Sequence, residues 1–399
     1  MRILYLNLDR GIPVEGDKGA SVHVREFVAA ASSLGHEVTL ACTTRGTGNP
    51  PPPARILEFA PPPADLSVGN EIERRERVRI EHDFSVGDRI CAALDRYGVK
   101  PDLVYERHAL FHRAGVCIAA RLGVPRILEV NAPLVEEQLR FRGLHLMDEA
   151  LAAEEKSYRG ADAIIAVSPQ VAAHVAAVLG RADRVHVVPN GVDLARFADA
   201  DTAGAVLRAR LGLGGRRIAG FIGSFKAWHG VAGLVEAVAT IAARYPALHL
   251  VAVGDGPERE AVAALVAARG LGARVTLPGR VPHGEIPAWL GAMDFTVAPY
   301  LPQPDFYFSP LKIFESLAAG RAVIAPAIGE IGGIIADGET GLLYPAGETR
   351  ALGAALARLL DDPAGCRAMG ARGRAGLAGR DWRDVVRFSL ACAPARLPA

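Results

Sequence analysis

The feature of this 399-residue chain that most constrains its fold is an alternation of short apolar runs with helix-length segments, which occurs twice. Such runs are typical of parallel strands joined by crossover helices, because these strands are buried on both faces. In the first half, strands are predicted to begin at Arg2, Glu37, Asp102, Arg126, Ala163 and Arg184. In the second half, they are predicted to begin at Arg217, Leu248, Arg274, Asp294 and Ala322. Because the repeat has no fixed period, it favours two Rossmann-like doubly wound domains over a solenoid.

The domain boundary is expected at Asn190-Gly191, after the last strand of the first half. This predicts an N-terminal domain over residues 1–189 and a C-terminal domain over residues 190–379. Residues 380–399 contain a predicted terminal helix beginning with DWRDVVRFSL, and the pattern leaves open which domain it packs on. The Pro-rich segment 49–65 is expected to be a stiff, extended loop, which is either a surface spacer or a loop on the acceptor side.

Composition restricts the class of partner. The net charge is only +1, which provides no global field for nucleic acid or an anionic membrane. No apolar run approaches the ~20 residues that span a bilayer, and the N-terminus is typical of a strand rather than a signal peptide. The five cysteines are scattered without a CxxC pair, so neither a disulfide framework nor a zinc site is indicated. A cytoplasmic protein with a small-molecule partner is expected.

One basic segment qualifies this expectation. EIERRERVRIEH, residues 71–82, pairs Glu71 with Arg75 at i,i+4 spacing, which favours an exposed helix. Such a helix is either a solvated face or a patch that meets lipid or a partner. Peripheral contact at the inner face of the membrane therefore stays open.

Ligands of doubly wound sheets bind beyond the carboxyl ends of the strands, so the loops there carry the candidate residues. The first strand leads into Lys18-Gly19-Ala20-Ser21, directly before a helix. Small residues at a helix N-terminus suit a bound anion, whereas a flexible loop with a Ser cap is the alternative. The dinucleotide fingerprint GxGxxG and the Walker A sequence are both missing, which argues against NAD, FAD and P-loop chemistry.

The first strand of the second half ends in GFIGSFKAWHG, in which Gly223 and Ser224 form a turn and Lys226 precedes a helix. A cation at a helix N-terminus works against the helix dipole, so Lys226 either pairs with an anion or extends into water. Only five of the 45 basic residues are lysines, and this scarcity favours the anion, with phosphate the obvious choice.

The segment YFSPLKIFESL, from Tyr307, is the most informative. Ser309 suits the N-cap and Pro310 the first helical position, so the free N–H groups of the following helix form a predicted anion site beside Lys312. Glu315 has no cation at i±4. Its carboxylate is either an ordinary exposed group or an acceptor for two hydroxyl groups, such as those of a ribose.

Several segments together resemble a known family. They are KGASVHVREF, LGHEVTL, VVPNGVDLARF, GSFKAWHGV, VGDGPE, LPGRVPH, APY and SPLKIFESLAAGRAVIAP. In this order and spacing the chain is similar to retaining glycosyltransferases of family 4 with the GT-B fold, in the subgroup with GSFKxWHG and FSPLK-type sequences. The resemblance implies two Rossmann-like domains facing a central cleft and a C-terminal helix that crosses back to the N-terminal domain. It places the nucleotide-diphosphate sugar mainly on the C-terminal domain and the acceptor mainly on the N-terminal one.

The resemblance also assigns donor-site residues. It implies that Glu315 binds the ribose, that Gly19 and Ala20 close over the diphosphate, and that main chain at Arg280 and Val281 reads the base. The remaining donor-site candidates are Gly223, Ser224, Lys226, Ser309, Pro310, Leu311 and Lys312.

The chain departs from the family pattern at three donor-site positions. Tyr307 replaces the first Glu of the paired-Glu motif, Ser224 replaces an Arg, and His229 replaces a Lys. Lys226 and Lys312 are therefore expected to neutralise the pyrophosphate and to act in catalysis.

On the acceptor side, the resemblance points to the end of the strand that begins at Asp102. His108 and Arg107 are the catalytic candidates there, since the family often has a His that positions the sugar. Glu129 and Asn131, at the next strand end, are expected to bind acceptor hydroxyls, and His23 is a weaker candidate.

The expected reaction is retaining, front-face transfer of a sugar to the hydroxyl of a glycan, a lipid-linked sugar or a small molecule. It needs no cofactor and no metal, and the DxD-like string at Asp199 and Asp201 is expected to be a loop. A GT-B sugar-nucleotide epimerase and a non-catalytic nucleotide-sugar-binding subunit are the alternatives.

Overall fold

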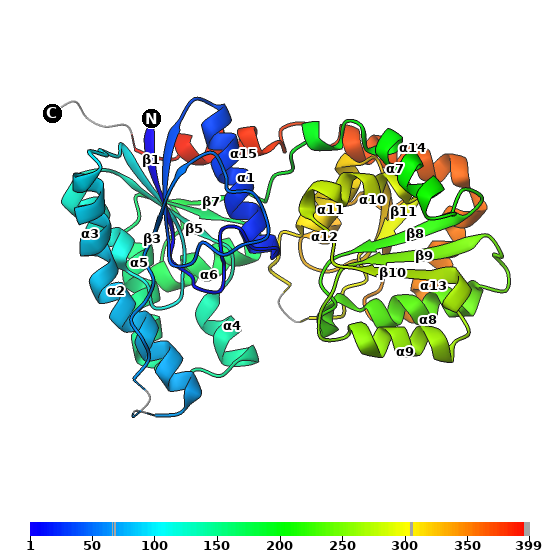
Figure 1. Ribbon diagram of the computed structural model, residues 1–399, viewed down its shortest axis with the longest axis horizontal. Coiled ribbons are helices and arrows are strands. Elements are labelled where there is room, and N and C mark those ends of the chain that lie inside the picture. The colour runs from blue at the N-terminus through cyan, green and yellow to red at the C-terminus, as the bar shows by residue number, and fades with distance from the viewer. Residues whose placement is uncertain (66, 68, 304–305, 395–399) are drawn as a thin grey trace. The chain divides into compact units, whose positions relative to one another are not determined.

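The computed structural model describes residues 1–65, 67, 69–303 and 306–394. They form two compact units (Figure 1). Unit 1 comprises Met1–Asn190, Tyr307–Ser309 and the described residues from Trp382 on, and unit 2 comprises Gly191–Phe306 and Pro310–Asp381. The short segment Tyr307–Ser309 thus belongs to unit 1, although its place in the sequence suggested the second domain. Residues 395–399, at the end of the predicted C-terminal segment, lie outside the described residues.

Unit 1 contains a seven-stranded sheet in the order β3-β2-β1-β4-β5-β6-β7, with every pairing parallel. Its strands are β1 (Arg2–Asn7), β2 (Glu37–Cys42), β3 (Arg55–Glu58), β4 (Leu103–Arg107), β5 (Arg126–Val130), β6 (Ala163–Ala166) and β7 (Val185–Val187). The helices are α1 (Gly19–Ser33), α2 (Glu71–Arg96), α3 (Ala114–Leu122), α4 (Leu134–Phe141), α5 (Met147–Arg159), α6 (Pro169–Leu179) and α15 (Trp382–Ala391).

Side-chain alternation along β1 explains the two layers of helices in unit 1. Leu4 and Leu6 point into the apolar cluster shared with α2 and α3. Tyr5, between them, points to the opposite face, where its ring lies 5.5 Å from Phe27 of α1 and 5.4 Å from Tyr105 of β4. The C-terminal helix α15 packs against α1 on that face.

Unit 2 contains a six-stranded parallel sheet in the order β10-β9-β8-β11-β12-β13. Its strands are β8 (Arg217–Ile222), β9 (Leu248–Val253), β10 (Val275–Gly279), β11 (Phe295–Val297), β12 (Ala322–Pro326) and β13 (Gly341–Tyr344). The α-helices are α7 (Ala200–Arg210), α8 (Val231–Ile241), α9 (Arg259–Ala268), α10 (Ile286–Ala292), α11 (Leu311–Ala318), α12 (Ile331–Ile334), α13 (Thr349–Asp361) and α14 (Pro363–Ala375). Short 3₁₀ turns are η1 (Ala195–Phe197), η2 (Ala227–His229), η3 (Gly272–Arg274) and η4 (His283–Glu285).

The predicted fold class of two Rossmann-like doubly wound domains is confirmed, and every predicted strand is present. In each sheet the strand order reverses beside the first strand, between β1 and β4 in unit 1 and between β8 and β11 in unit 2. Ligands bind at such switch points, beyond the carboxyl ends of the strands. The loops after β1, β4, β8 and β11 are therefore where each unit offers a site.

Two strands, β3 and β13, were not predicted from the sequence. β3 lies inside the Pro-rich segment that was expected to be a loop; it is an edge strand, where flanking prolines are tolerated. β13 is only four residues long, too short for a periodic signal. Helix α2 also continues to Arg96, well beyond the charged stretch that predicted it. Within the described part of the chain, no helix is long and apolar enough to span a membrane.

Candidate functional site

The loops at the carboxyl edge of the unit 2 sheet are tied together by backbone hydrogen bonds. The N–H of Gly223 donates to the carbonyl of Val253 at 3.0 Å, and the N–H of Gly254 donates to the carbonyl of Gly279 at 2.8 Å. A Cβ atom at Gly254 would lie 1.8 Å from the carbonyl oxygen of Gly223, and both glycines have positive φ. Glycine is therefore required where the loops after β8 and β9 meet.

Lys312 lies in the first turn of α11, and its ammonium group lies beside these loops at the carboxyl edge of the sheet. Its Nζ lies 4.7 Å from the ring centre of Phe221 and 4.9 Å from that of Tyr300. Nζ is shielded from solvent and has no hydrogen-bond partner among the described residues. Burial lowers the pKa of Lys312 to about 7, although Glu315 acts in the opposite direction. A buried, unpaired ammonium group is costly unless an anion joins it.

Gly223 provides the space beside this ammonium group. A Cβ atom at Gly223 would lie 2.6 Å from Nζ of Lys312, and its φ of +151° favours glycine. The backbone of the first strand-end loop of unit 2 therefore approaches Lys312 without an intervening side chain.

The start of α11 differs from the prediction. The helix begins at Leu311, and its N-cap, Pro310, has no side-chain capping bond. The hydroxyl of Ser309, expected to be the cap, instead accepts the backbone N–H of Asn190 at 3.0 Å. The first N–H groups of α11 therefore lack a side-chain cap, which leaves them suited to an anion next to Lys312.

The segment after β8 holds a neutral histidine and a second lysine. Nδ1 of His229 donates to the carbonyl of Ser224. Burial and the neighbouring Lys312 lower the pKa of His229 to about 3, so the ring is uncharged at neutral pH. Lys226 is exposed, and its Nζ lies 4.6 Å from the ring centre of Trp228. The two lysines of unit 2 thus differ: Lys312 is shielded and Lys226 faces solvent.

Glu315 has a partner that sequence spacing did not reveal. Its Oε1 accepts a hydrogen bond from Nε2 of His283 at 2.9 Å. His283 follows β10 in the same loop as Arg280 and Val281, the predicted base-reading residues. It stands at the end of the LPGRVPH segment that carried the resemblance, yet no role was assigned to it.

In unit 1, helix α1 begins at Gly19 with Lys18 at the N-cap and no side-chain capping bond. The alternative of a Ser cap is therefore wrong, because Ser21 lies inside the helix. Nζ of Lys18 donates to the carbonyl of Gly11 at 2.8 Å. The uncapped N-terminus at Gly19 and Ala20 remains suited to an anion.

Glu129, predicted to bind acceptor hydroxyls, is instead surrounded by protein donors. Its Oε1 contacts Nε2 of His23 at 2.8 Å, Nη1 of Arg107 at 3.1 Å and Nδ2 of Asn131 at 2.5 Å. The hydroxyl of Tyr105 donates to Oε2 at 2.7 Å. Burial would raise the pKa of Glu129, but its partners, His23 first, lower it to about 2. The carboxylate is therefore ionised and largely satisfied within unit 1.

His108 follows β4 in a buried loop. Neither ring nitrogen has a hydrogen-bond partner among the described residues, and Nε2 lies 3.9 Å from Oε1 of Glu154. Burial lowers the pKa of His108 to about 4, with Glu154 opposing the shift. Phe111, in the same loop, has a φ of 69°, a conformation that bulky residues rarely adopt outside constrained sites.

Tyr307 occupies the position of the missing motif Glu, and it packs inside unit 1. Its ring belongs to an apolar cluster with Tyr158 and Val171, and its hydroxyl donates to Oε2 of Glu137 at 2.9 Å. Burial and then Glu137 raise the pKa of Tyr307 well above its usual value. The aromatic side chain therefore acts as an anchor of the segment before α11.

The DxD-like string is not the loop that was expected. Asp199 is the N-cap of α7, and Asp201 lies in its first turn, where its carboxylate pairs with Arg321. No group of three or more His, Cys, Asp or Glu side chains in the described ranges is arranged to hold a metal ion.

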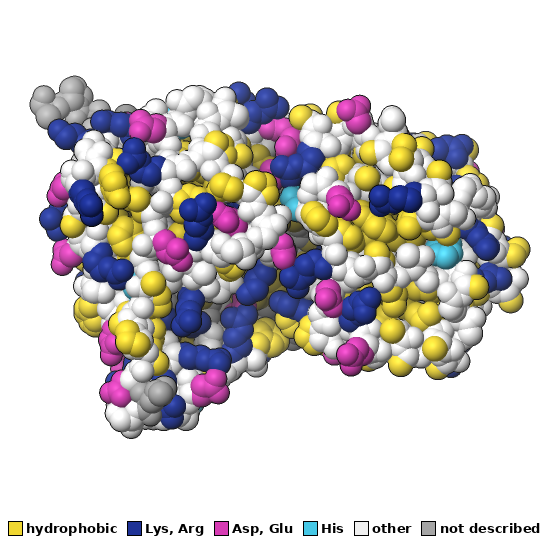
Figure 2. Space-filling model, viewed as in Figure 1, with side chains coloured by type: hydrophobic (Ala, Val, Ile, Leu, Met, Phe, Trp, Pro, Cys, Tyr) yellow, Lys and Arg dark blue, Asp and Glu magenta, His cyan; other side chains and the backbone are white. Residues whose placement is uncertain are grey.

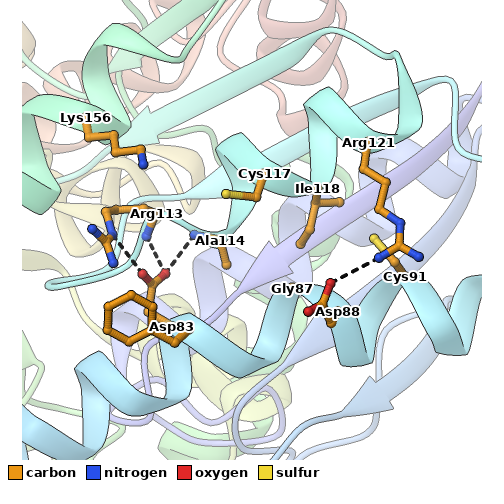
Figure 3. A pocket seen from close by; sticks show the side chains of 11 residues that line it. Asp83, Gly87, Asp88, Cys91, Arg113, Ala114, Cys117, Ile118, Arg121 and Lys156 are labelled. Atoms are coloured by element: carbon orange, nitrogen blue, oxygen red, sulfur yellow. Dashed lines mark hydrogen bonds and ion pairs between the residues drawn. The ribbon is translucent and has the colours of Figure 1, made fainter.

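A hollow lined by charged side chains lies elsewhere in unit 1 (Figure 3). This cavity of about 330 Å³ lies between α2 and α3 and contains none of the predicted site residues. Asp83 caps α3 by accepting the N–H of Ala114 at 2.8 Å, and it also binds the guanidinium of Arg113 at 2.9 Å. Arg121 pairs with Asp88 across the same hollow at 3.1 Å. Most of its charged groups are thus used within the protein.

Two family models match the chain in succession. The model described as Glycosyltransferase Family 4 matches residues 18–196, and the model described as Glycosyl transferases group 1 matches residues 216–362. The first range covers most of unit 1, and the second covers the sheet of unit 2.

Curated relatives agree with these matches. Alpha-D-kanosaminyltransferase of Streptomyces kanamyceticus is 27% identical over 78% of this chain and 86% of that protein. 2-Deoxystreptamine glucosyltransferase of the same organism is 32% identical over 62% of this chain and 64% of that protein. D-inositol 3-phosphate glycosyltransferase of Nocardia farcinica is 34% identical over 58% of this chain and 52% of that protein.

Solved structures share the architecture. Anabaena HepE in complex with UDP covers 98% of this chain and 99% of its own, with a TM-score of 0.73 at 18% identity. Sucrose-phosphate synthase from Thermosynechococcus elongatus covers 97% of both chains, with a TM-score of 0.73 at 25% identity. The two Rossmann-like units therefore define a GT-B fold. With the family models and the relatives, this shows that the chain is a glycosyltransferase of the GT-B class.

Proposed function

We propose that this glycosyltransferase transfers a sugar from a nucleoside-diphosphate sugar to an acceptor hydroxyl, with retention of configuration and without a metal ion. The observation that carries the proposal is the ammonium group of Lys312. It is shielded, has no hydrogen-bond partner among the described residues and lies next to the uncapped start of α11. A diphosphate would supply the missing negative charge.

The remaining donor contacts follow from the same edge of unit 2. Glu315, one turn after Leu311, would accept the ribose hydroxyls, and main chain at Arg280 and Val281 would face the base. Lys226 would add a second, exposed cation. Anabaena HepE has been crystallised with UDP and with UDP-glucose, which supports a nucleotide-sugar donor for a chain of this fold.

The proposed chemistry is a front-face displacement. The bond between the sugar and the phosphate oxygen breaks, the acceptor oxygen bonds to the same face of the sugar carbon, and the hydroxyl proton passes to the departing phosphate. Lys312 and the N–H groups of α11 would stabilise the negative charge that grows on the diphosphate. These fixed charges are the reason to propose a reaction that needs no metal.

On the acceptor side we propose a positioning role for His108 and Arg107. Since the pKa of His108 is about 4, its ring is neutral at physiological pH and would act as a hydrogen-bonding group rather than as an acid. The acceptor is a glycan, a lipid-linked sugar or a small molecule. The names of two relatives contain a cyclitol, 2-deoxystreptamine and inositol 3-phosphate, so small polyhydroxylated rings are the first acceptors to test.

The test begins with a thermal-shift screen of the full chain against UDP, GDP, ADP and dTDP, followed by their sugars. Product formed with an acceptor panel is then analysed by NMR for anomeric configuration, with and without EDTA. We expect a product whose configuration matches the donor, and equal rates with EDTA. An inverted product or EDTA-sensitive turnover would contradict the proposed mechanism. Conversion of the donor in the absence of any acceptor would instead indicate an epimerase.

We also propose that the protein is cytoplasmic and that it makes peripheral contact with the inner face of the membrane. On α2, Arg75 pairs with Glu71 and Arg77 pairs with Glu73, so part of the basic charge is neutralised locally. Figure 2 shows basic and acidic side chains interspersed over the visible face. Flotation with vesicles containing anionic lipid tests this contact, and no co-flotation at low salt would exclude it.

A further inference from the structure

The carboxylate of Glu315 ends a chain of polar contacts that starts more than a hundred residues earlier in the sequence. Nε2 of His283 lies 2.9 Å from Oε1 of Glu315, and Nδ1 of His283 lies 3.2 Å from Nη1 of Arg196. Nη2 of Arg196 lies 3.4 Å from Oδ2 of Asp193. All four residues belong to unit 2 and come from three separate segments: the stretch around η1, the loop after β10, and α11.

The chemistry of the contacts determines where the protons lie. A guanidinium group only donates, so Nδ1 of His283 must accept from Arg196. The hydrogen of the neutral ring is therefore on Nε2, and it is donated to Glu315. A protonated His283 would direct an N–H group at the N–H groups of Arg196. Asp193, which also accepts the backbone N–H of Arg196 at 3.2 Å, holds the arginine in place.

We infer that His283 is a positioning residue, which holds the carboxylate of Glu315 ready for the two ribose hydroxyls of the donor nucleotide. The inference rests on the proposed function, since it takes Glu315 as the ribose contact. It adds Arg196 and Asp193 as the groups that hold His283 in the tautomer that donates to Glu315.

The carboxylate of Glu315 retains acceptor positions for a ribose. The side chains of His283 and Glu315 are only 18% and 15% exposed, so their contact is stronger than a typical surface pair. His283 uses one acceptor position of Oε1, and Oε2 has no side-chain hydrogen-bond partner in the described part of the chain. A carboxylate offers about four acceptor positions, so a diol can bind while His283 remains in place. Because the Glu315 side chain is already ordered, less rotamer entropy is lost on binding.

The experiment measures recognition of the ribose, which a general structural role would not change selectively. Calorimetry on the full chain compares the tightest binder among UDP, GDP and ADP with its 2′,3′-dideoxy counterpart. The variants are His283→Ala, His283→Gln and Glu315→Gln. The control is His249→Gln, since His249 contacts Thr276 on β9 and β10, away from Glu315.

We expect His283→Ala to weaken the ribonucleotide about tenfold and the dideoxynucleotide hardly at all. His283→Gln should retain most of the affinity, because the Gln amide can donate the same hydrogen bond. Circular dichroism and Tm verify that each variant is folded.

The outcomes distinguish the role of Glu315 from that of His283. If Glu315→Gln leaves the ribonucleotide preference unchanged, or if none of the three nucleotides binds, the proposed donor site is wrong. If Glu315→Gln removes the preference but His283→Ala keeps it, Glu315 contacts the ribose without help and the inference on His283 is overturned. Equal weakening of both nucleotides by His283→Ala would also overturn it, since that result indicates general damage.

Discussion

Each of the two units carries a buried charge near the carboxyl edge of its sheet, and the surroundings of these two charges differ. In unit 1, the carboxylate of Glu129 accepts hydrogen bonds from Tyr105, Arg107 and Asn131, and it lies 2.8 Å from Nε2 of His23. In unit 2, the ammonium group of Lys312 lies beside two aromatic rings and has no hydrogen-bond partner among the described residues. Burial alone therefore does not mark a binding site. The informative observation is a buried charge whose partner the protein itself does not supply.

The difference has a physical basis. A buried ion that is fully hydrogen-bonded contributes to a rigid fold, and removal of one partner is strongly destabilising. A buried ion without a partner reduces the stability of the free protein, and this cost is recovered when a ligand of opposite charge binds. Substitutions at Glu129 and Lys312 should consequently change stability in opposite directions.

The largest expected effect is at Glu129. Glu129→Ala leaves His23 and Arg107 without their shared carboxylate, and should lower the free energy of unfolding of unit 1 by about 3–5 kcal/mol. Urea denaturation followed by circular dichroism measures this. Glu155→Ala, which removes an exposed i,i+4 pair with Arg159, is the matched control and should change stability by less than about 0.5 kcal/mol. A loss at Glu129 no larger than that of the control would mean that the network is not structural.

The pKa of Glu129 adds a pH signature to this prediction. The folded pKa of about 2 lies below the ordinary value of 4.5, so the unfolded chain binds more protons between these values. The stabilisation by Glu129 is therefore fully present above about pH 4.5 and is lost as the pH falls towards 2. The stability gap between the wild type and Glu129→Gln should close over this window.

The second largest effect is at Lys312. Lys312→Met removes a shielded, unpaired charge, so the free protein should have a higher Tm, while the affinity for UDP or the preferred nucleotide should fall about 100-fold. Differential scanning calorimetry and titration calorimetry measure the two quantities. Lys100→Met, at an exposed position of unit 1, should change neither. A lower Tm together with unchanged nucleotide affinity would place Lys312 among the structural groups and would remove the contrast with Glu129.

The third effect is the pH dependence of nucleotide binding. Because the pKa of Lys312 is about 7 in the free protein, its side chain loses the proton above that pH, and a bound diphosphate requires the proton back. Affinity should therefore decrease above pH 7, by up to about tenfold per pH unit, in a range where the phosphate itself is already ionised. The slope should vanish in Lys312→Met and persist in Lys226→Met. A flat profile in the wild type would show that Lys312 stays charged without a ligand.

The lowered pKa of Lys312 also changes the free energy of unfolding with pH, in the opposite direction to the nucleotide affinity. The folded pKa of Lys312, about 7, lies below the ordinary value of 10.5, so the unfolded chain binds more protons between these values. The free protein should consequently become more stable from pH 7 towards 10.5 through this group, while its affinity for the nucleotide decreases.

The smallest effect concerns Tyr307. Tyr307→Phe keeps the ring in the apolar cluster of unit 1 and removes only the hydrogen bond to Glu137, so it should cost about 1 kcal/mol. Tyr97→Phe, at an exposed ring, is the control. Tyr307→Glu, which restores the residue of the family motif, should be far more destabilising because it buries a second carboxylate beside Glu137. Unchanged stability in Tyr307→Glu would mean that the side chain is not anchored in unit 1.

The sequence indicates the types of residue at the candidate site better than it indicates their partners. Lys312 lies near a predicted helix start, and this prediction needs only local information. Of the two rings beside its ammonium group, that of Phe221 lies 91 residues earlier in the sequence, and the other belongs to Tyr300 in the loop after β11. Glu315 was correctly seen to lack a partner at i±4, but its contact with His283 spans 32 residues. Hydrophobic periodicity in the sequence does not predict contacts between residues this far apart.

The wrong predictions have the same cause. Ser309 has the residue type and position of a helix cap, yet its hydroxyl bonds with the backbone of Asn190, 119 residues away in the sequence. Glu129 follows the expected pattern of a residue at a strand end, and only its tertiary neighbours show that its oxygens are already occupied. Likewise, the strand β3 forms among prolines because β2 offers a free edge, which the local sequence does not show.

The sequence by itself determined most strands and helices, the doubly wound class and the loops that carry the candidate residues, because hydrophobic periodicity and turn residues act over a few residues. The resemblance then extended this to a glycosyltransferase, which the family models and relatives show. Only the tertiary structure decided which buried charges are satisfied. Hydrogen-bond partners and the exclusion of water depend on side chains that are distant in the sequence and come into contact in the fold. Those contacts satisfy the carboxylate of Glu129 and leave the ammonium group of Lys312 without a hydrogen-bond partner among the described residues.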